Sequence, residues 1–248
     1  SVNAGGRMMY PPTGGYIDIR RQLANGQTLR TRQENNGNQL GGFGNAQLSL
    51  DYSPTTKDNV TFSLRNSRRA FNLENNQQSY SFVGTTKTPS FGNQIDTKNM
   101  GNNLDMNLDY TRKFEKENKE FSILAQFSQN KGDNSYTRNQ YQGASVGETS
   151  YRENNPNKSL TQERTIQIDY QDPLSQYAQI ETGAKMILRH IESDFRFNYD
   201  STGRGAYIAN PLRTNVFSYD QNVYSGYLSF LFQTKNKWGF KPGLRYEY

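Results

Sequence analysis

Apolar and polar residues alternate along several stretches of this chain. Residues 46–64 read AQLSLDYSPTTKDNVTFSL, and every second residue from Ala46 to Tyr52 and again from Val60 to Leu64 is apolar. A period of two places successive side chains on opposite faces of a strand. The polar residues between the two runs are typical of a short turn. The segment therefore predicts a β-hairpin with one apolar face and one polar face.

The same pattern recurs in three further segments: 103–129, 164–188 and 223–248. Matching tripeptides (LDY, LDY and IDY) begin at Leu50, Leu108 and Ile168, which are 58 and 60 residues apart. Only the hairpins match, because the segments between them share no residue pattern. The repeat is therefore architectural and consists of a strand, a short turn, a strand and a long connection.

The long connections, at about 72–99, 131–160 and 189–221, are rich in Asn, Gly, Ser and Gln. Alternating short and long connections are typical of outer-membrane barrels, which have short periplasmic turns and long external loops. Each expected strand has the roughly ten residues that a tilted strand needs to cross the hydrocarbon. We therefore predict an all-β fold, an antiparallel transmembrane β-barrel. Residues 40–248 would supply four hairpins, about seven or eight strands of a larger barrel, and residues 1–39 a Gly- and Asn-rich extracellular loop segment.

A soluble β-sandwich that binds carbohydrate is an alternative, because its strands also have one apolar face. In a sandwich, Tyr52, Tyr110 and Tyr170 would be aromatics at the rim of a core. In a barrel they would form a girdle, with the rings at the lipid headgroups and the hydroxyls in water. The alternation of short and long connections and the wholly polar opposite face favour the barrel.

Composition restricts the classes of function. The hydrophobic fraction is 32% and the mean hydropathy is -0.98, values that would indicate disorder without the 17 Tyr and 14 Phe. The absence of cysteine excludes disulfides and thiolate metal sites. No apolar run approaches the roughly 18 residues of a membrane helix, and neither a signal peptide nor a plug domain is expected in this chain. The net charge of +6 is scattered among 23 acidic residues, which argues against a nucleic-acid partner.

The alternation assigns each strand residue to one of two faces. The residues expected to face lipid are Leu48, Leu50, Tyr52, Phe62, Leu64, Leu104, Met106, Leu108, Tyr110, Phe121, Ile123, Phe127, Ile166, Ile168, Tyr170, Ile180 and Met186. The residues expected to face the lumen are Ser49, Asp51, Ser63, Asp105, Asn107, Asp109, Gln126, Gln167, Asp169, Glu181 and Lys185. Short, hydrogen-bonding lumen residues of mixed charge suit a wide, hydrated interior. The pattern therefore predicts a large barrel.

Three aspartates fall at one level near the expected periplasmic mouth: Asp51, Asp109 and Asp169. They could form a docking ring for a plug domain. They could equally be solvated acids that bond to neighbouring strands.

Arginines and aromatic residues mark the expected outer end of the barrel. Arg65, Arg68 and Arg69 could contact the phosphates of lipopolysaccharide, since guanidinium groups suit phosphate, or could be solvated loop bases. The aromatic residues of the expected loops are Tyr80, Phe82, Phe91, Tyr136, Tyr141 and Tyr151. They could stack on sugars or on a chelate ligand, or they could pack the loops together.

The residues indicate no enzymatic, metal or cofactor site. His190 is the only histidine, and Glu192 and Asp194 lie nearby, but a metal site needs further ligands and a side chain at the rim is the simpler interpretation. Asp200, Ser201 and Gly203 lie in a tight turn that could hold calcium or be a plain loop turn. No nucleophile–base pair is present. We therefore expect no catalytic residue, metal or cofactor, and the sequence singles out no ligand-binding residue.

Several consecutive motifs carry a family resemblance. The motifs are a strand ending in Asp-Tyr, PLS in the turn, GAK in the next strand, SDF at its top, and then VYSGY and GLRYE. Over about Leu40–Tyr248 the chain resembles the outer-membrane β-barrel family related to TonB-dependent receptors. Residues 1–39 match no motif of that family.

The resemblance implies a bacterial outer-membrane location and a 22-strand barrel with an N-terminal plug. It implies uptake, energised through TonB, of a large nutrient such as a metal chelate, an oligosaccharide or a peptide. The implied partners are outer-membrane lipid and lipopolysaccharide, TonB, and a surface lipoprotein or other subunits of an outer-membrane complex. A non-transporting accessory or structural barrel, acting in an assembly, secretion or surface complex, is the alternative function.

Overall fold

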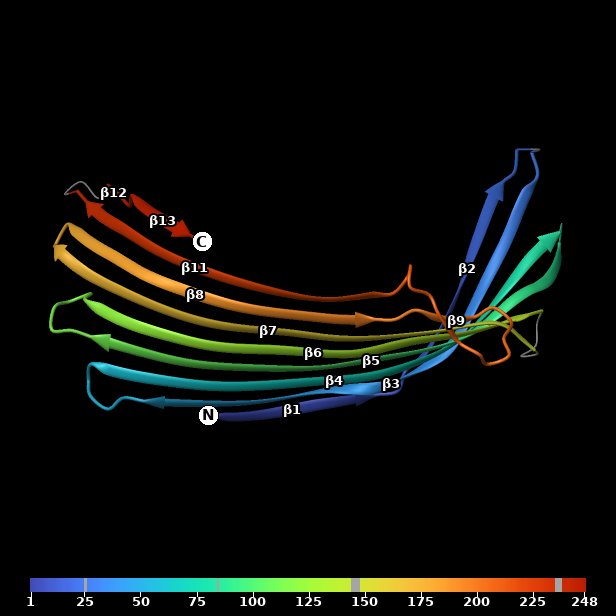
Figure 1. Ribbon diagram of the computed structural model, residues 1–248, viewed down its shortest axis with the longest axis horizontal. Coiled ribbons are helices and arrows are strands. Elements are labelled where there is room, and N and C mark those ends of the chain that lie inside the picture. Colours follow the sequence, from blue (N-terminus) through green and yellow to red (C-terminus); the bar gives the residue numbers. More distant parts are fainter. Residues whose placement is uncertain (25, 84, 144–147, 235–237) are drawn as a thin grey trace.

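The protein is a single curved antiparallel β-sheet (Figure 1). A computed structural model describes residues 1–24, 26–83, 85–143, 148–234 and 238–248. The strands are β1 (Val2–Met9), β2 (Pro12–Gln22), β3 (Thr28–Tyr52), β4 (Asp58–Val83), β5 (Thr86–Lys113), β6 (Glu120–Gln142), β7 (Thr149–Ser175), β8 (Ala178–Phe195), β9 (Asn198–Asp200), β10 (Ile208–Ala209), β11 (Asn215–Gln233), β12 (Gly239–Phe240) and β13 (Gly243–Glu247). The predicted all-β antiparallel fold is confirmed.

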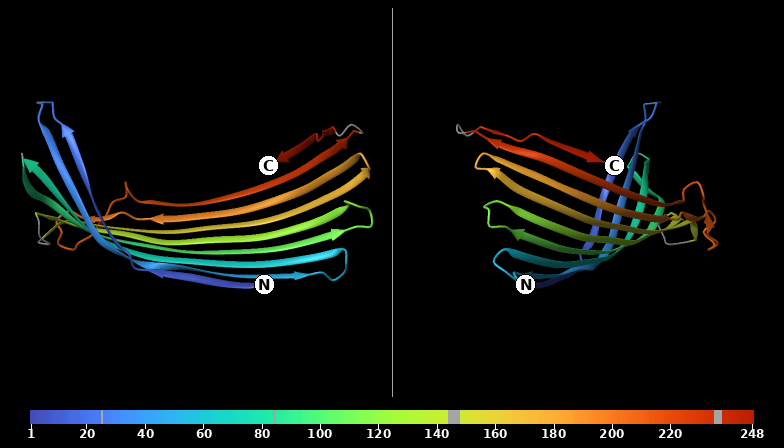
Figure 2. Two further views of the ribbon diagram at one scale, coloured as in Figure 1. Left: turned by 180° about the vertical axis from the view of Figure 1, so that it is seen from behind. Right: turned by 60° about the vertical axis from the view of Figure 1, so that its left-hand side comes forward.

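The strands follow one another around the sheet with no crossover. Their order is β1-β3-β4-β5-β6-β7-β8-β11-β12; β13 also pairs with β11, β2 with β3, and β9 with β7. Every pair of strands with extensive contacts is also joined by backbone hydrogen bonds, so the described residues form one layer with no second sheet stacked on it. The sheet curves without closing, and its edges at β1 and at β12 and β13 lie apart (Figure 2).

One group of short connections lies at one end of the sheet (Figure 1), and others, between β2 and β3 and between β4 and β5, lie at the opposite end. The first group comprises residues 53–57, 114–119 and 176–177, and a fourth expected turn of this group includes residues 235–237, which lie outside the described part of the chain. Asn118 adopts a left-handed backbone conformation in the second turn, with φ of 60°. Pro173 lies where the register of β7 and β8 shifts, and such a bulge accommodates a residue that lacks a backbone donor.

The expected long loops are, for the most part, extended strands. β4 continues to Val83 and β5 starts at Thr86, while β6 and β7 are joined only across residues 143–148. Residues 196–214 alone form a long irregular connection, with the short strands β9 and β10 inside it. The expectation of long structureless loops at 72–99 and 131–160 is therefore wrong. Backbone N–H and C=O groups can pair between strands whatever the side chains are. Polar sequences can therefore extend the hairpins without any alternation of apolar and polar residues.

Residues 1–39 also form strands rather than a loop segment. β3 is 25 residues long and pairs with β4 on one side. On its other side, its two halves pair with different strands. β2 pairs with Thr28–Asn38 of β3, and β1 pairs with Gly41–Leu48. Pro12 opens β2, a position where the missing N–H is tolerated.

The strands are much longer than a membrane requires. The 26 residues of β4 span about 85 Å at roughly 3.3 Å per residue, whereas about ten residues suffice to cross a bilayer. β2 and the parts of β3, β4 and β5 farthest from the turns at 53–57 and 114–119 bend away from the rest of the sheet (Figure 1). We call these parts the hairpin extensions. The described residues include no helix that is long and apolar enough to cross a membrane.

Candidate functional site

An apolar band crosses one face of the sheet. Because Cα partners share a face, the pairings can be followed from strand to strand. One such row is Leu50, Phe62, Leu108, Ala125, Ile166, Met186 and Tyr224. All 17 residues expected to face lipid lie on this face by the same pairing. Their contact with lipid stays a prediction.

Large apolar side chains are exposed on the apolar face. On the apolar face, Leu50, Leu108 and Ile168 are 53%, 47% and 42% exposed, whereas Thr165 and Ser229 on the polar face are only 4% and 9% exposed. A contiguous exposed apolar surface that crosses several strands marks contact with a partner or a membrane. The β-sandwich alternative requires these side chains to pack against a second layer, which the described residues do not contain.

The apolar band runs obliquely across the strands. Tyr52 and Tyr110 share a row through Val60, but Phe121 pairs with Arg112, two residues beyond Tyr110. Tyr170 pairs with Phe121, and Ile180 then pairs with Asp172, which is again two residues further on. This stepwise shift of the band is the stagger that arises when strands tilt relative to the axis of a barrel.

The tyrosines at the lower edge of the band have polar partners toward the short turns. The Tyr110 hydroxyl donates to Asp58 Oδ1 at 2.8 Å, and the Tyr170 hydroxyl donates to Asp172 Oδ2 at 3.0 Å. Lys116 Nζ donates to Asp172 Oδ1 at 2.9 Å. The rings therefore lie on the apolar face while their hydroxyls join a charged, hydrated layer, which is the arrangement of an interfacial girdle.

The opposite face is polar and hydrogen-bonded across strands. All 11 residues expected to face the lumen lie on it by the same pairing. Asn107 Nδ2 donates to Ser63 Oγ at 3.1 Å, and Lys241 Nζ donates to Glu181 Oε2 at 2.6 Å. A hollow of about 350 Å³ is lined by polar residues that include Ser63, Asn107 and Arg65.

The three aspartates near the turns differ in their surroundings. Asp51 Oδ1 accepts from the Thr61 hydroxyl at 2.7 Å, and Asp169 Oδ1 accepts from the Tyr227 hydroxyl at 2.7 Å. The Tyr227 ring reaches Asp169 over Gly183, where a Cβ would lie 2.5 Å from both Asp169 Oδ1 and Tyr227 Cε1. Two of the acids therefore bond to neighbouring strands. Their use as a docking ring stays a prediction.

The three clustered arginines do not share a face. Arg68 pairs with Asn102 and lies on the apolar face, whereas Arg65 pairs with Asp105 and Arg69 with Gly101 on the polar face. Strand alternation separates residues an odd number apart, so the expectation that the three act together at the outer surface is wrong for Arg65 and Arg69. Arg68 alone remains a candidate contact to lipid phosphate.

The histidine lies between two carboxylates on the apolar face. His190 Nδ1 lies 2.7 Å from Asp220 Oδ1, and Nε2 lies 2.9 Å from Glu192 Oε1. Asp194, also considered as a ligand, is bound by the Arg196 guanidinium at 2.8 and 3.0 Å. Across the described ranges, no three His, Asp or Glu side chains are grouped as a metal ion requires.

Asp200 organises the tight turn that was a candidate calcium site. The side chain is 2% exposed, and its oxygens accept from Thr202 N at 2.9 Å, Thr202 Oγ1 at 2.8 Å and Gly205 N at 2.7 Å. These donors, the Gly205 amide first, lower the pKa of Asp200 to about 2. The carboxylate therefore stabilises the loop directly, because its lone pairs are taken by loop donors.

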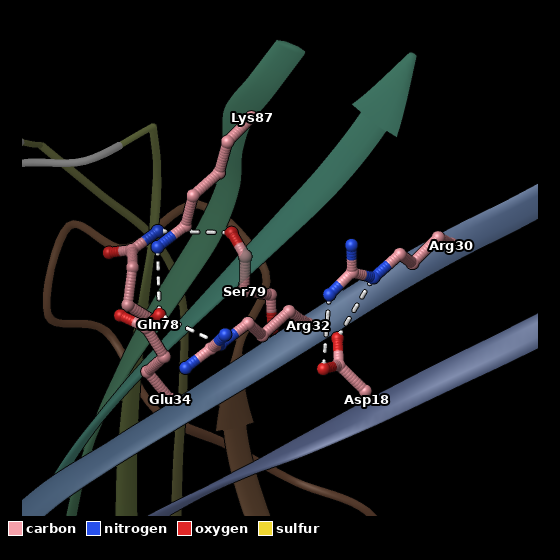
Figure 3. A network of polar contacts seen from close by, with 7 residues as sticks. All are labelled: Asp18, Arg30, Arg32, Glu34, Gln78, Ser79 and Lys87. Carbon is pink, nitrogen blue, oxygen red and sulfur yellow. Dashed lines mark hydrogen bonds and ion pairs between the residues drawn. The ribbon is translucent and has the colours of Figure 1, made fainter. Parts of the chain in front are cut away.

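The hairpin extensions contain a charged network that the sequence did not indicate (Figure 3). The Arg30 guanidinium donates to both oxygens of Asp18 at 3.2 and 3.1 Å. Glu34 Oε1 lies 2.7 Å from Lys87 Nζ and 3.0 Å from Arg32 Nε, and the Lys87 hydrogen bond lowers the pKa of Glu34. The alternating charges of β3 were the only sequence signal, and they lay in a segment interpreted as a loop.

Two cations of this network make cation–π contacts with aromatic rings. Arg32 lies 4.0 Å from the ring centroid of Tyr16, and Lys87 lies 3.7 Å from that of Tyr80. The predicted loop aromatics lie in strands: Tyr80 and Phe82 in β4, Phe91 in β5, Tyr136 and Tyr141 in β6, and Tyr151 in β7. The Tyr141 ring covers Gly92 on the neighbouring strand, where any Cβ would clash. These contacts favour the interpretation that the aromatic residues pack the extensions together.

Comparison with known proteins gives one family. A model described as an outer membrane protein beta-barrel family matches residues 112–248, which are 137 of the 248 residues (248 minus 111). No curated protein sequence matches the chain. The matched segment covers β6, β7, β8 and β11, which carry half of the apolar band.

Proposed function

Because this chain belongs to the outer membrane protein beta-barrel family, we propose that it forms part of the wall of a large barrel that takes up a bulky solute in the manner of a TonB-dependent receptor. Family membership places the chain in the bacterial outer membrane. The apolar band is then the surface that meets lipid, and the polar face lines the lumen.

The width of the open sheet is the observation that carries the proposal. Nine strands follow one another along the sheet, from β1 to β12, and the edges still lie apart. An open strand edge in hydrocarbon leaves N–H and C=O groups unpaired, at a cost of several kcal/mol each. Further strands are therefore required for closure, whichever chain supplies them. A barrel of about eight strands is filled by its own side chains, whereas a wider one leaves space for water, a solute or a plug.

The chemistry of the polar face supports passage of a hydrophilic solute. Residues such as Ser63, Asn107 and Gln126 offer short hydrogen-bonding groups, and acidic and basic residues are mixed along it. Metal chelates, oligosaccharides and peptides all suit such a wall. TonB and a surface lipoprotein are the partners that the proposal adds, on the strength of the sequence resemblance.

Dependence of uptake on TonB tests the proposal. The full-length protein would be expressed in isogenic cells with and without TonB, and accumulation of a panel of labelled chelates, oligosaccharides and peptides would be measured. We expect accumulation of at least one class only in cells that contain TonB. Equal accumulation without TonB, or stable co-purification with other outer-membrane proteins and no solute dependence, would favour the accessory barrel and contradict uptake.

A further inference from the structure

Two glycines of the polar face lie side by side on neighbouring strands. Gly101 of β5 and Gly132 of β6 are Cα partners, in the same alternation that places Asp105 of β5 on this face. Asparagines lie two residues before and two residues after each glycine, on the same face: Asn99, Asn103, Asn130 and Asn134. The polar face therefore has no side chain of its own at the two glycines and has carboxamides on either side of them.

Side chains from three strands lie over the two glycines. A Cβ added at Gly101 would be 3.0 Å from Nε and 3.4 Å from Cζ of Arg69, which comes from β4. A Cβ added at Gly132 would be 2.5 Å from Oγ of Ser159, on β7, and 3.5 Å from Nδ2 of Asn134. A guanidinium, a hydroxyl and a carboxamide therefore lie against the strand backbone, in space that a larger residue would fill. We call Arg69, Asn134 and Ser159 the donor cluster.

The donor cluster has no polar partner in the described part of the chain. Arg69 is exposed, and its side chain, like those of Asn134 and Ser159, makes no hydrogen bond or ion pair there. Asn99 and Asn130, at opposite corners of the glycine pair, are also exposed, and their side chains are unpaired within the same ranges. These five side chains are therefore free to bind a molecule that reaches the polar face.

The positive charge of the donor cluster is not neutralised by a neighbouring acid. Among the described residues of the polar face, the nearest acidic side chains are Asp105 and Glu163, each four residues along its strand from the cluster. Four residues span about 13 Å. Asp105 is the Cα partner of Arg65, and Glu163 accepts from Arg189 at 2.7 Å. The cluster therefore carries one uncompensated positive charge, surrounded by neutral hydrogen-bonding groups.

The donor cluster lies at the end of the polar face next to the hairpin extensions. Gly101 is nine residues from Tyr110 of the girdle on β5, and Gly132 is eleven residues from Phe121 on β6. About ten residues are what a tilted strand uses to cross the hydrocarbon. In the barrel proposed above, a solute that enters from outside would meet the cluster before the rest of the lumen wall.

We propose that the donor cluster binds the carboxylate of an acidic sugar in the solute that the barrel takes up, an inference that rests on the proposed function. Arg69, Asn134 and Ser159 donate to the carboxylate oxygens. Asn99 and Asn130 bind the neighbouring hydroxyls, because a carboxamide both donates and accepts as hydroxyls require. One positive charge matches a carboxylate, whereas a phosphate group carries about −1.5 to −2. The solute class is therefore an acidic oligosaccharide.

Binding of digalacturonate to the purified full-length protein tests the proposal. Titration calorimetry compares the wild type with Arg69→Gln, which removes the charge and keeps a polar side chain. Binding is expected to weaken at least about tenfold, because hydrogen bonds from a charged group are lost. The matched control is Arg65→Gln, a cation of the same strand and face four residues away. Its effect is expected to stay below about twofold, because salt screens charges at that separation.

Two further arms identify the chemistry of the ligand. The methyl ester of digalacturonate keeps the hydroxyls and loses the charge, so it is expected to bind the wild type as weakly as digalacturonate binds Arg69→Gln. Acetate keeps a carboxylate without the hydroxyls, and millimolar acetate is expected to displace little digalacturonate. Mobility on unheated gels checks that each variant is folded. If Arg69→Gln does not fold, Ser159→Ala decides, with an expected loss of about threefold.

Several results would overturn the proposal: equal binding of digalacturonate by the wild type and Arg69→Gln, an equal loss in Arg65→Gln, undiminished binding of the ester, or displacement by acetate. Uptake with and without TonB is measured in parallel. Loss of specific binding while TonB-dependent uptake of a neutral solute persists would remove the acidic-sugar site alone. Specific binding of digalacturonate without any TonB-dependent uptake would support the site and contradict the proposed function.

Discussion

An arginine placed in the middle of the apolar band is expected to destabilise the protein in its membrane. Met106 lies four residues from Tyr110 in the girdle and six from Met100 at the opposite boundary. At roughly 3.3 Å per residue and a tilt of about 40°, Met106 lies about 10 Å from one boundary and about 15 Å from the other. It is therefore close to the midplane, between Leu64 and Phe127 of the neighbouring strands.

The expected cost of Met106→Arg is about 3 kcal/mol, within the roughly 2–4 kcal/mol for arginine at the midplane of a membrane barrel. This free energy corresponds to a change of about a hundredfold in the folding equilibrium. The matched control is Gln126→Arg, which adds the same side chain to the polar face of the adjacent strand at the next row. That variant is expected to change the free energy of unfolding by less than about 0.5 kcal/mol, as exposed substitutions commonly do.

Folding of the full-length protein into phospholipid vesicles would be titrated with urea. The readouts are fluorescence of Trp238, the single tryptophan of the sequence, and mobility on unheated gels. A Met106→Arg variant as stable as the wild type would refute the assignment of this face to lipid. An equal loss in the free energy of unfolding for Gln126→Arg would also refute it, because the account predicts a difference between the two faces.

Three further predictions concern a glycine contact, a buried acid and an ion pair. Gly183→Ala is expected to lose about 1–3 kcal/mol in the same titration, because its Cβ would crowd the Asp169–Tyr227 hydrogen bond. With its pKa lowered to about 2, Asp200 stabilises its loop above its ordinary pKa of 3.8, and that order is lost as the pH falls through about 2, which amide hydrogen exchange measures. Lys87→Ala is expected to raise the pKa of Glu34 toward its ordinary 4.5, measured by NMR titration.

Each of these three has a result that would contradict it. Gly226→Ala is the control for the glycine, since its Cβ would meet only a carbonyl oxygen at 3.8 Å, and equal losses in both variants would remove the steric argument. Unchanged protection of the Gly205 amide in Asp200→Asn would show that the carboxylate does not hold the turn. An unmoved Glu34 titration would show that Lys87 is not its partner in solution.

The alternation of apolar and polar residues predicted the strands of the apolar band. A strand with an apolar environment on one face and a polar one on the other has a sequence period of two. Leu50, Leu108 and Ile168 lie on one face as that period requires. The hairpin extensions, including β2, were not predicted, because polar residues occupy both of their faces and no clear alternation results. Their backbone hydrogen bonds leave no mark on side-chain composition. β1 was missed although Val2, Ala4 and Met8 alternate with other residues and lie on the apolar face, where Val2 pairs with Leu48.

The candidate sites were less predictable than the strands. The separation of Arg68 from Arg65 and Arg69 could have been predicted, since alternation alone assigns their faces. The contact of Lys87 with Glu34 and the stacking of Arg32 on Tyr16 could not, because each depends on the register between strands. That register is set by turn lengths and bulges, such as the shift at Ser79 and Tyr80, which single sequences do not specify.

Spin labels along one strand test most directly whether the apolar face meets hydrocarbon. The sequence contains no cysteine, so single cysteines at positions 104–110 of the full-length protein in vesicles give unambiguous labelling. Collisions of each label with oxygen, which partitions into lipid, and with a water-soluble nickel complex would be compared. We predict that positions 104, 106, 108 and 110 favour oxygen and that 105, 107 and 109 favour nickel. Even-numbered positions shielded from both reagents, or open only to nickel, would contradict the account.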